Sequence, residues 1–160
     1  MPYKYLALFI VLASTAGAQR FEIGGLAGGG GFGAEDTSGT YWIAGAEGCA
    51  FCNRKTALFA EYNHYGLASG QTVIKNADIV SGGLRVQSTA ERFRPYFDIG
   101  IAGGQDHFLG KAHNFVGVAM GGGVAISLGK NWYVRPGVRL QLMSYLHYGL
   151  SAGVSAGYRF

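Results

Sequence analysis

The sequence is poor in charged residues, which make up 14% of its 160 residues, against roughly 25% in an average soluble domain. Basic residues outnumber acidic ones by only 4 and are scattered, so no nucleic-acid-binding surface is predicted. Proline occurs 3 times and glycine has no Gly-X-Y period, which excludes collagen. Hydrophobic residues, at 49%, are too frequent for a disordered chain. The chain is therefore expected to fold, with much apolar surface and little charge to keep that surface in water.

The sequence also lacks a transmembrane helix, because no segment after its first residues has 18 consecutive apolar residues. The first 18 residues have the three parts of a secretory signal peptide: Lys4, an apolar stretch at 6–13, and small residues before a cleavage site between Ala18 and Gln19. A buried N-terminal helix of a cytosolic protein is the alternative. The predicted organisation is a signal peptide at 1–18 and one exported domain at 19–160.

The strongest pattern in that domain is an alternation with period two, which is typical of β-strands. Val116 and Val118, for example, alternate with Gly117 and Ala119. Polar turns are predicted at 53–55, 89–93 and 129–131. A run of glycines at 28–31 leaves the faces of the first strand unassigned. Eight strands are predicted in total, at 21–33, 40–52, 56–68, 78–88, 94–108, 115–128, 132–146 and 148–160.

The residue types on the two faces of these strands predict whether each face meets water, lipid or the barrel interior. In a soluble barrel the face opposite Val and Leu should be rich in Lys and Glu, whereas here it is mainly Gly, Ala and Ser. Small residues suit the narrow interior of an eight-stranded barrel, and the bulky apolar face suits lipid. Trp132 and Phe160 at one end, with Trp42 and Tyr148 at the other, fit two interfacial girdles. The predicted fold is an all-β, eight-stranded, antiparallel, up-and-down transmembrane β-barrel.

The last residues, GVSAGYRF, resemble the C-terminal strand of outer-membrane β-barrel proteins. The segments RPYFDIGIAGG and NWYVRPGVRLQL resemble strands of the small eight-stranded OmpA-like and OmpX-like barrels. This resemblance implies a monomer in the outer membrane of a Gram-negative-type cell, with membrane lipids as its surroundings. It also implies that Tyr158 and Phe160 belong to a signal read by the barrel-assembly machinery.

Charged residues on the predicted inner face are candidates for an interior network, because a buried charge without a partner costs several kcal/mol. The expected role of this network is to lock and plug the barrel. A polar lumen that conducts small ions is the alternative. The candidates are Glu47, Glu61, Arg85, Asp98, Arg135, Arg139 and Arg159.

Cys49 and Cys52 are the only cysteines and form a C-x-x-C motif. Export to an oxidising compartment favours a local disulfide between them. Residues three apart on a strand point to opposite faces, so this disulfide requires a bend after Cys49. Two free thiols are the alternative.

No cofactor, metal or catalytic site is predicted. The four histidines lack metal-ligand spacing, and the glycine run lacks the Gly-Lys-Ser/Thr of a phosphate loop. His147 and Ser151 do not match the His-x-Ser pattern of lipid A deacylases, since roughly 13 Å separates residues four apart on a strand. We therefore expect a structural or surface-interacting protein without catalysis. A narrow channel is the main alternative, and a soluble exported ligand-binding barrel or a lipid A-modifying enzyme are weaker ones.

Overall fold

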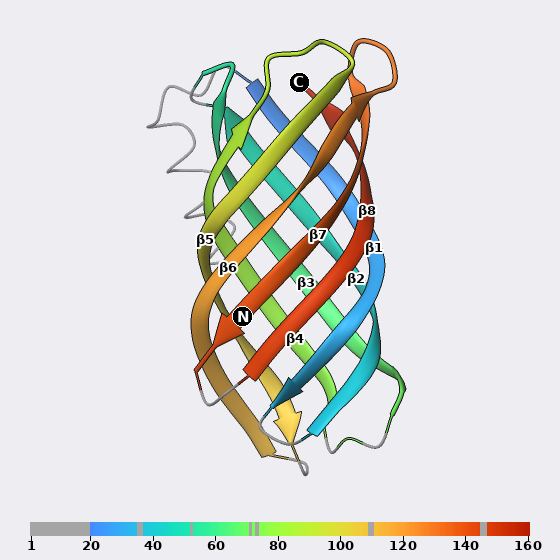
Figure 1. The fold of residues 1–160 in the computed structure, drawn as a ribbon, viewed down its shortest axis with the longest axis vertical. Helices are drawn as coiled ribbons and strands as arrows, with labels where there is room; N and C mark the ends of the chain where they lie inside the picture. The colour runs from blue at the N-terminus through green and yellow to red at the C-terminus, as the bar shows by residue number, and fades with distance from the viewer. Residues whose placement is uncertain are drawn as a thin grey trace.

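The computed structural model describes residues 20–34, 37–51, 53–70, 72, 74–108, 111–144 and 147–160. They form one closed barrel (Figure 1). Its strands are β1 (Arg20–Ala34), β2 (Thr37–Phe51), β3 (Thr56–Ser69), β4 (Ile74–Gln87), β5 (Phe93–Phe108), β6 (Lys111–Ser127), β7 (Trp132–Met143) and β8 (His147–Arg159). Among the described residues, no helix is long and apolar enough to cross a membrane.

Each strand pairs antiparallel with its neighbours in sequence, and β1 pairs with β8 to close the sheet. At the seam, Gly28 lies opposite Gly153 of β8 on one side and Ile43 of β2 on the other. Closure leaves no unpaired strand edge, so backbone donors and acceptors bond within the sheet. The predicted up-and-down barrel of eight strands is confirmed.

The barrel has two mouths, which Figure 1 shows at its upper and lower ends. The proximal mouth contains Arg20, Phe160 and the β2–β3, β4–β5 and β6–β7 connections. The distal mouth contains the other four connections. Three strands extend further toward the distal mouth than predicted: β2 begins at Thr37, β4 at Ile74 and β6 at Lys111. Polar residues such as Lys75 and Asn114 interrupt the apolar alternation there. The backbone ladder continues through Asn114, which pairs with Gln105, whereas the β4–β5 register shifts between Ile74 and Ala77, at Lys75.

The bulky apolar face points away from the barrel axis, as predicted. Ile101 is 69% exposed and Val154 is 48% exposed, whereas their neighbours Ala102 and Ser155 are buried. The structure also assigns the faces of β1: Ile23 is 60% exposed and Glu22 is buried. Trp132 contacts Tyr158, which contacts Phe160, at the proximal mouth. Trp42 and Tyr148 lie toward the distal mouth.

The glycine run of β1 lets two backbones approach closely. A Cβ atom added to inward-facing Gly30 would lie 2.2 Å from the carbonyl oxygen of Leu150 on β8. A Cβ added to Gly28 would lie 2.3 Å from the carbonyl oxygen of Ala152. These contacts explain why glycine occupies the seam between the first and last strands.

The interior has two levels with different chemistry. The distal half is filled by apolar and aromatic side chains, with Phe32, Tyr41, Tyr65 and Phe115 at its centre. The Phe32 ring lies 5.7 Å from Tyr41 and 5.6 Å from Tyr65, measured between centroids. The proximal half contains most of the buried charged residues; Asp106, also buried, lies in the distal half.

Candidate functional site

The charged side chains of the proximal half form one continuous chain of alternating sign, which we call the ionic ladder. Each link joins an arginine to a carboxylate from another strand. In order from the proximal mouth, the members are Arg159, Glu22, Arg135, Glu47, Arg85, Asp98, Arg139 and Glu61. Seven of the eight strands contribute to it. The exception is β6, whose inward Gly121 leaves room for the side chain of Arg139.

All links of the ladder except the one between Arg85 and Glu47 are at hydrogen-bond distance. Arg159 Nε lies 2.6 Å from a Glu22 oxygen, and Arg135 bonds both Glu22 and Glu47, the latter at 2.7 Å. Arg85 bonds Asp98 through Nε at 2.7 Å and through Nη2 at 2.8 Å, while its distance to Glu47 is 3.6 Å.

The ladder ends near the middle of the barrel. Arg139 Nη2 lies 3.0 Å from Asp98 and 2.8 Å from Glu61. Asn63 then donates a hydrogen bond to Glu61. Because each charge has at least one partner of opposite sign, the cost of burying these groups is largely offset.

Neutral groups complete the surroundings of the ladder. Ser155 and Tyr133 donate hydrogen bonds to Glu47. The Arg135 guanidinium lies 4.5 Å from the centre of the Tyr133 ring, and the Arg85 guanidinium lies 4.6 Å from that of Tyr96. Hydrogen bonds and aromatic faces together hold the guanidinium planes across the lumen.

The structure thus brings together all seven charged residues named from the sequence and adds Glu22. Sequence analysis missed Glu22 because the glycines that follow it hide the phase of β1. The apolar residues on either side, Phe21 and Ile23, were the available signal. With Glu22 included, the ladder has four carboxylates and four guanidiniums, so its formal charge is zero.

Cys49 lies beside this ladder. Its free thiol is buried and accepts a hydrogen bond from Arg85 Nη1 at 2.8 Å. The expected bend after Cys49 is absent from the described part of β2, which continues to Phe51 and directs the Cys49 side chain inward. Cys52, the predicted disulfide partner, lies outside the described residues.

Histidines and acidic residues gather toward the distal mouth. His147 Nε2 lies 2.8 Å from Asp106, and His113 lies 3.5 Å from the other oxygen of that carboxylate. His64 lies 2.8 Å from Asp78. Within the described ranges, no group of three or more His, Cys, Asp or Glu side chains is placed to hold a metal ion.

Comparison with known proteins places this geometry among solved barrels. No protein-family model and no curated protein matches the sequence. The N-terminal β-barrel domain of OprF from Pseudomonas aeruginosa matches with a TM-score of 0.68 at 15% identity, covering 89% of this chain and 98% of that one. The chain has the fold of small outer-membrane β-barrels.

Two further structures share the fold. Neisserial surface protein A has a TM-score of 0.66 at 13% identity, covering 87% of this chain and 95% of its own. The outer-membrane protein OprG from Pseudomonas aeruginosa has a TM-score of 0.60 at 15% identity, covering 89% and 96%. The predicted resemblance is therefore confirmed for the fold.

The other residues named from the sequence lie at the ends of the barrel domain. The proposed cleavage site, Ala18 and Gln19, lies outside the described residues. Tyr158 and Phe160 lie at the proximal mouth, where the backbone amide of Phe160 donates to the carbonyl of Phe21 at 2.9 Å. This bond extends the β1–β8 pairing to residue 160.

Proposed function

We propose that this chain is a monomeric integral outer-membrane protein whose closed barrel has a structural or surface-interacting role. The observation that carries the proposal is that the lumen is filled at two successive levels. The ionic ladder fills the proximal half, and the aromatic cluster around Phe32 fills the distal half. A channel needs a continuous open path through the lumen, and each of these two levels interrupts it.

Lipid is the proposed partner of the outer surface. The apolar belt includes Ile101, Leu84 and Val138, which are 69%, 52% and 58% exposed and lie on β5, β4 and β7. Acyl chains accept such side chains at little cost, whereas water does not. The belt extends around the barrel, so it fits a bilayer better than a single protein partner.

The contents of the lumen argue against the channel alternative. A cavity of only about 40 Å³ lies beside Glu61 and Arg139, between the two levels. A continuous water path would have to pass both Phe32 and Tyr65, which are fully buried in contact with one another. These buried side chains therefore interrupt a continuous water path through the lumen.

Planar-bilayer recording tests the closed lumen directly. The full mature protein is refolded in detergent and added to a bilayer in about 1 M salt, where exposed charges are strongly screened. We expect no stepwise conductance, whereas an open porin added under the same conditions gives steps. Reproducible conductance steps that appear only when the protein is added would overturn the proposal.

The polar side chains also favour a role without catalysis. His147 is engaged by Asp106 and by the Ser144 carbonyl oxygen at 3.0 Å, and Ser151 lies four residues further along β8. The ladder carboxylates are each held by arginine, so none is available as a base. Incubation with lipid A and phospholipid should therefore yield no hydrolysis product, and product that depends on Ser151 would contradict this view.

The proposed partner during biogenesis is the barrel-assembly machinery, which would contact the aromatic side chains of Tyr158 and Phe160. Phe160 is 68% exposed at the proximal mouth and is thus accessible to a protein. Phe160→Ala should reduce assembly in cells several-fold while leaving refolding in detergent unchanged. Equal yields of variant and wild type in cells would remove this partner from the proposal.

A further inference from the structure

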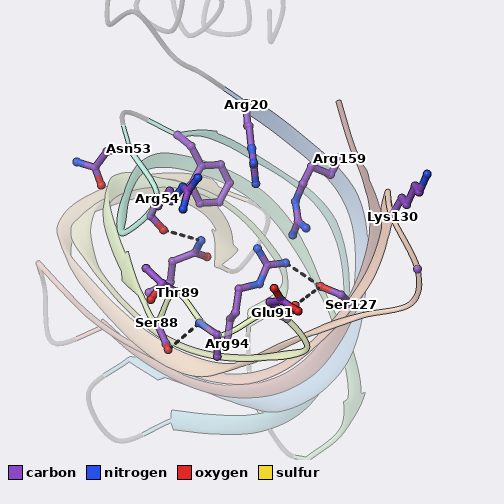
Figure 2. Close-up of a pocket in the computed structure, with 14 residues that line it drawn as sticks. Arg20, Asn53, Arg54, Ser88, Thr89, Glu91, Arg94, Ser127, Lys130 and Arg159 are labelled. Atoms are coloured by element: carbon purple, nitrogen blue, oxygen red, sulfur yellow. Dashed lines mark hydrogen bonds between the residues drawn. The ribbon is translucent and has the colours of Figure 1, made fainter.

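The proximal mouth contains a cavity of about 490 Å³ above the end of the ionic ladder. Figure 2 shows the residues around it. Its lining is strongly basic, since it includes five cationic side chains and one acidic side chain, that of Glu91. The cationic residues are Arg20, Arg54, Arg94, Lys130 and Arg159. Asn53, Ser88, Thr89 and Ser127 add hydrogen-bonding groups.

Arg94 is the unusual member of this lining. It is only 8% exposed, and its Nη2 donates a hydrogen bond to Ser127 Oγ at 3.0 Å. Its Nε has no hydrogen-bond partner. Within the described parts of the chain, no carboxylate forms an ion pair with Arg94. A buried guanidinium in this state is costly unless an anion accompanies it.

The ionic ladder does not supply that anion. Its four carboxylates are matched by four arginines, and the nearest of these carboxylates to the mouth, Glu22, already binds Arg135 and Arg159. Arg94 is therefore a fifth buried guanidinium beyond a neutral set. The surplus positive charge lies where the lumen meets the aqueous phase.

The surrounding guanidiniums face the same space. In Figure 2, the side-chain ends of Arg20, Arg94 and Arg159 point toward one another inside the mouth, whereas Lys130 points away from it. Guanidiniums directed at one point repel each other, and among the described residues only Arg159 of these three is already paired, with Glu22. An anion with several oxygen atoms could pair with Arg94 and Arg20 and also approach Arg159.

We propose that this mouth binds a phosphoryl group, with Arg94 as its central contact. The planar fork of arginine matches two oxygens of a phosphate. The Ser127 hydroxyl accepts from Arg94 and donates to the Glu91 carbonyl oxygen at 3.2 Å, so it holds the guanidinium in place at the mouth. The group could belong to soluble phosphate or to the headgroup of a phospholipid in the adjacent leaflet, which share this chemistry. Binding at this mouth requires neither an open nor a closed lumen.

Titration of the refolded full chain tests the site. In an uncharged maltoside detergent, inorganic pyrophosphate is added and followed by calorimetry and by the thermal unfolding midpoint. In a second arm, the protein is placed in vesicles of phosphatidylcholine with or without phosphatidylglycerol. Saturable binding in the first arm identifies a soluble ligand. Stabilisation by phosphatidylglycerol without pyrophosphate binding identifies a lipid headgroup.

Two variants of equal charge separate a built site from general attraction. Arg94→Gln should weaken binding at least tenfold and remove the ligand-dependent rise in midpoint. Lys130→Gln removes one charge from the same cavity but should change affinity less than threefold. Arg94→Lys keeps the positive charge but loses the planar fork, so its binding should be weakened as much as that of Arg94→Gln. If Arg94→Gln does not fold, Arg94→Lys takes its place in the comparison with Lys130→Gln. No saturable effect in either arm, or equal losses in Arg94→Gln and Lys130→Gln, would overturn the proposal.

Discussion

The Arg85 guanidinium and the Asp98 carboxylate lie directly opposite each other on β4 and β5 and form two parallel hydrogen bonds inside the barrel. Both side chains are almost completely buried. A pair joined in this two-pronged way fixes direction as well as distance. It also ties two neighbouring strands at the centre of the ladder, because each partner binds a further member: Arg85 binds Glu47, and Asp98 binds Arg139.

Asp98→Asn should destabilise the protein strongly. The substitution keeps the shape of the side chain but leaves Arg85 and Arg139 without their shared carboxylate, and breaking a buried pair in this way costs about 3–5 kcal/mol. Asp78→Asn is the matched control, because the Asp78 side chain is 42% exposed where it meets His64. An exposed pair contributes at most about 1 kcal/mol. Urea unfolding of both variants in detergent measures the difference, and equal costs would show that the ladder does not stabilise the barrel.

The free-energy cost of an arginine on the outward face should depend on its depth in the membrane. Val154 lies midway along β8 and faces outward, so Val154→Arg should cost about 2–4 kcal/mol in folding into lipid vesicles. Leu128, 58% exposed, follows the end of β6 at the proximal mouth. Leu128→Arg should therefore cost about 0–1 kcal/mol, as expected near an interface. If this outer face met water instead of lipid, both variants would fold as well as the wild type.

For the strands after β1, the alternation of residue size was sufficient to predict which side faces out. Val154 and Ser155 illustrate why: lipid and a packed lumen favour opposite sizes, so one step along the strand changes the residue class. The same contrast is lost in β1 after Ile23, where both faces hold glycine, and Glu22 was missed for that reason. Arg94 shares the face of Asp98 four residues later, but the sequence does not reveal that it is unpaired.

The order of the ionic ladder could not be predicted from the sequence. Arg135 binds Glu47, which is 88 residues away, and Ser155 binds the same carboxylate from 108 residues away. These partners meet across the lumen rather than through strand pairing. Their choice depends on the stagger of the strands around the closed barrel and on side-chain length, and neither is encoded in a local pattern.

The glycines of β1 should differ in their tolerance of a methyl group. Gly30→Ala places a Cβ 2.2 Å from the Leu150 carbonyl oxygen, so β1 and β8 must separate, at a cost of about 1–3 kcal/mol. Gly25 faces outward, and a Cβ there meets no atom within 4 Å. Gly25→Ala should leave stability unchanged or raise it by up to about 1 kcal/mol. Urea midpoints of the two variants provide the test, and a tolerated Gly30→Ala would mean that the seam is looser than the structure indicates.

The aromatic cluster of the distal half should contribute about as much to the free energy of unfolding as the Asp98 ion pairs of the ladder. Phe32 is fully buried, and its ring centre lies 6.0 Å from that of Phe115 as well as close to Tyr41 and Tyr65. Phe32→Ala should therefore cost about 3–5 kcal/mol, since the surrounding rings cannot collapse fully into the space that it leaves. Phe93→Ala is the control, because Phe93 is 55% exposed at the rim and its removal leaves no internal cavity.

The conductance of Phe32→Ala shows which of the two levels of the lumen blocks ion flow. Phe32→Ala opens the distal half only, and the ionic ladder still fills the proximal half. We therefore expect the variant to unfold at lower urea concentration while remaining without stepwise conductance in a planar bilayer. If Phe32→Ala conducts while still folded, the aromatic cluster alone closes the barrel, and the ladder is permeable to ions. If Asp98→Asn conducts and Phe32→Ala does not, the ladder is instead the main barrier.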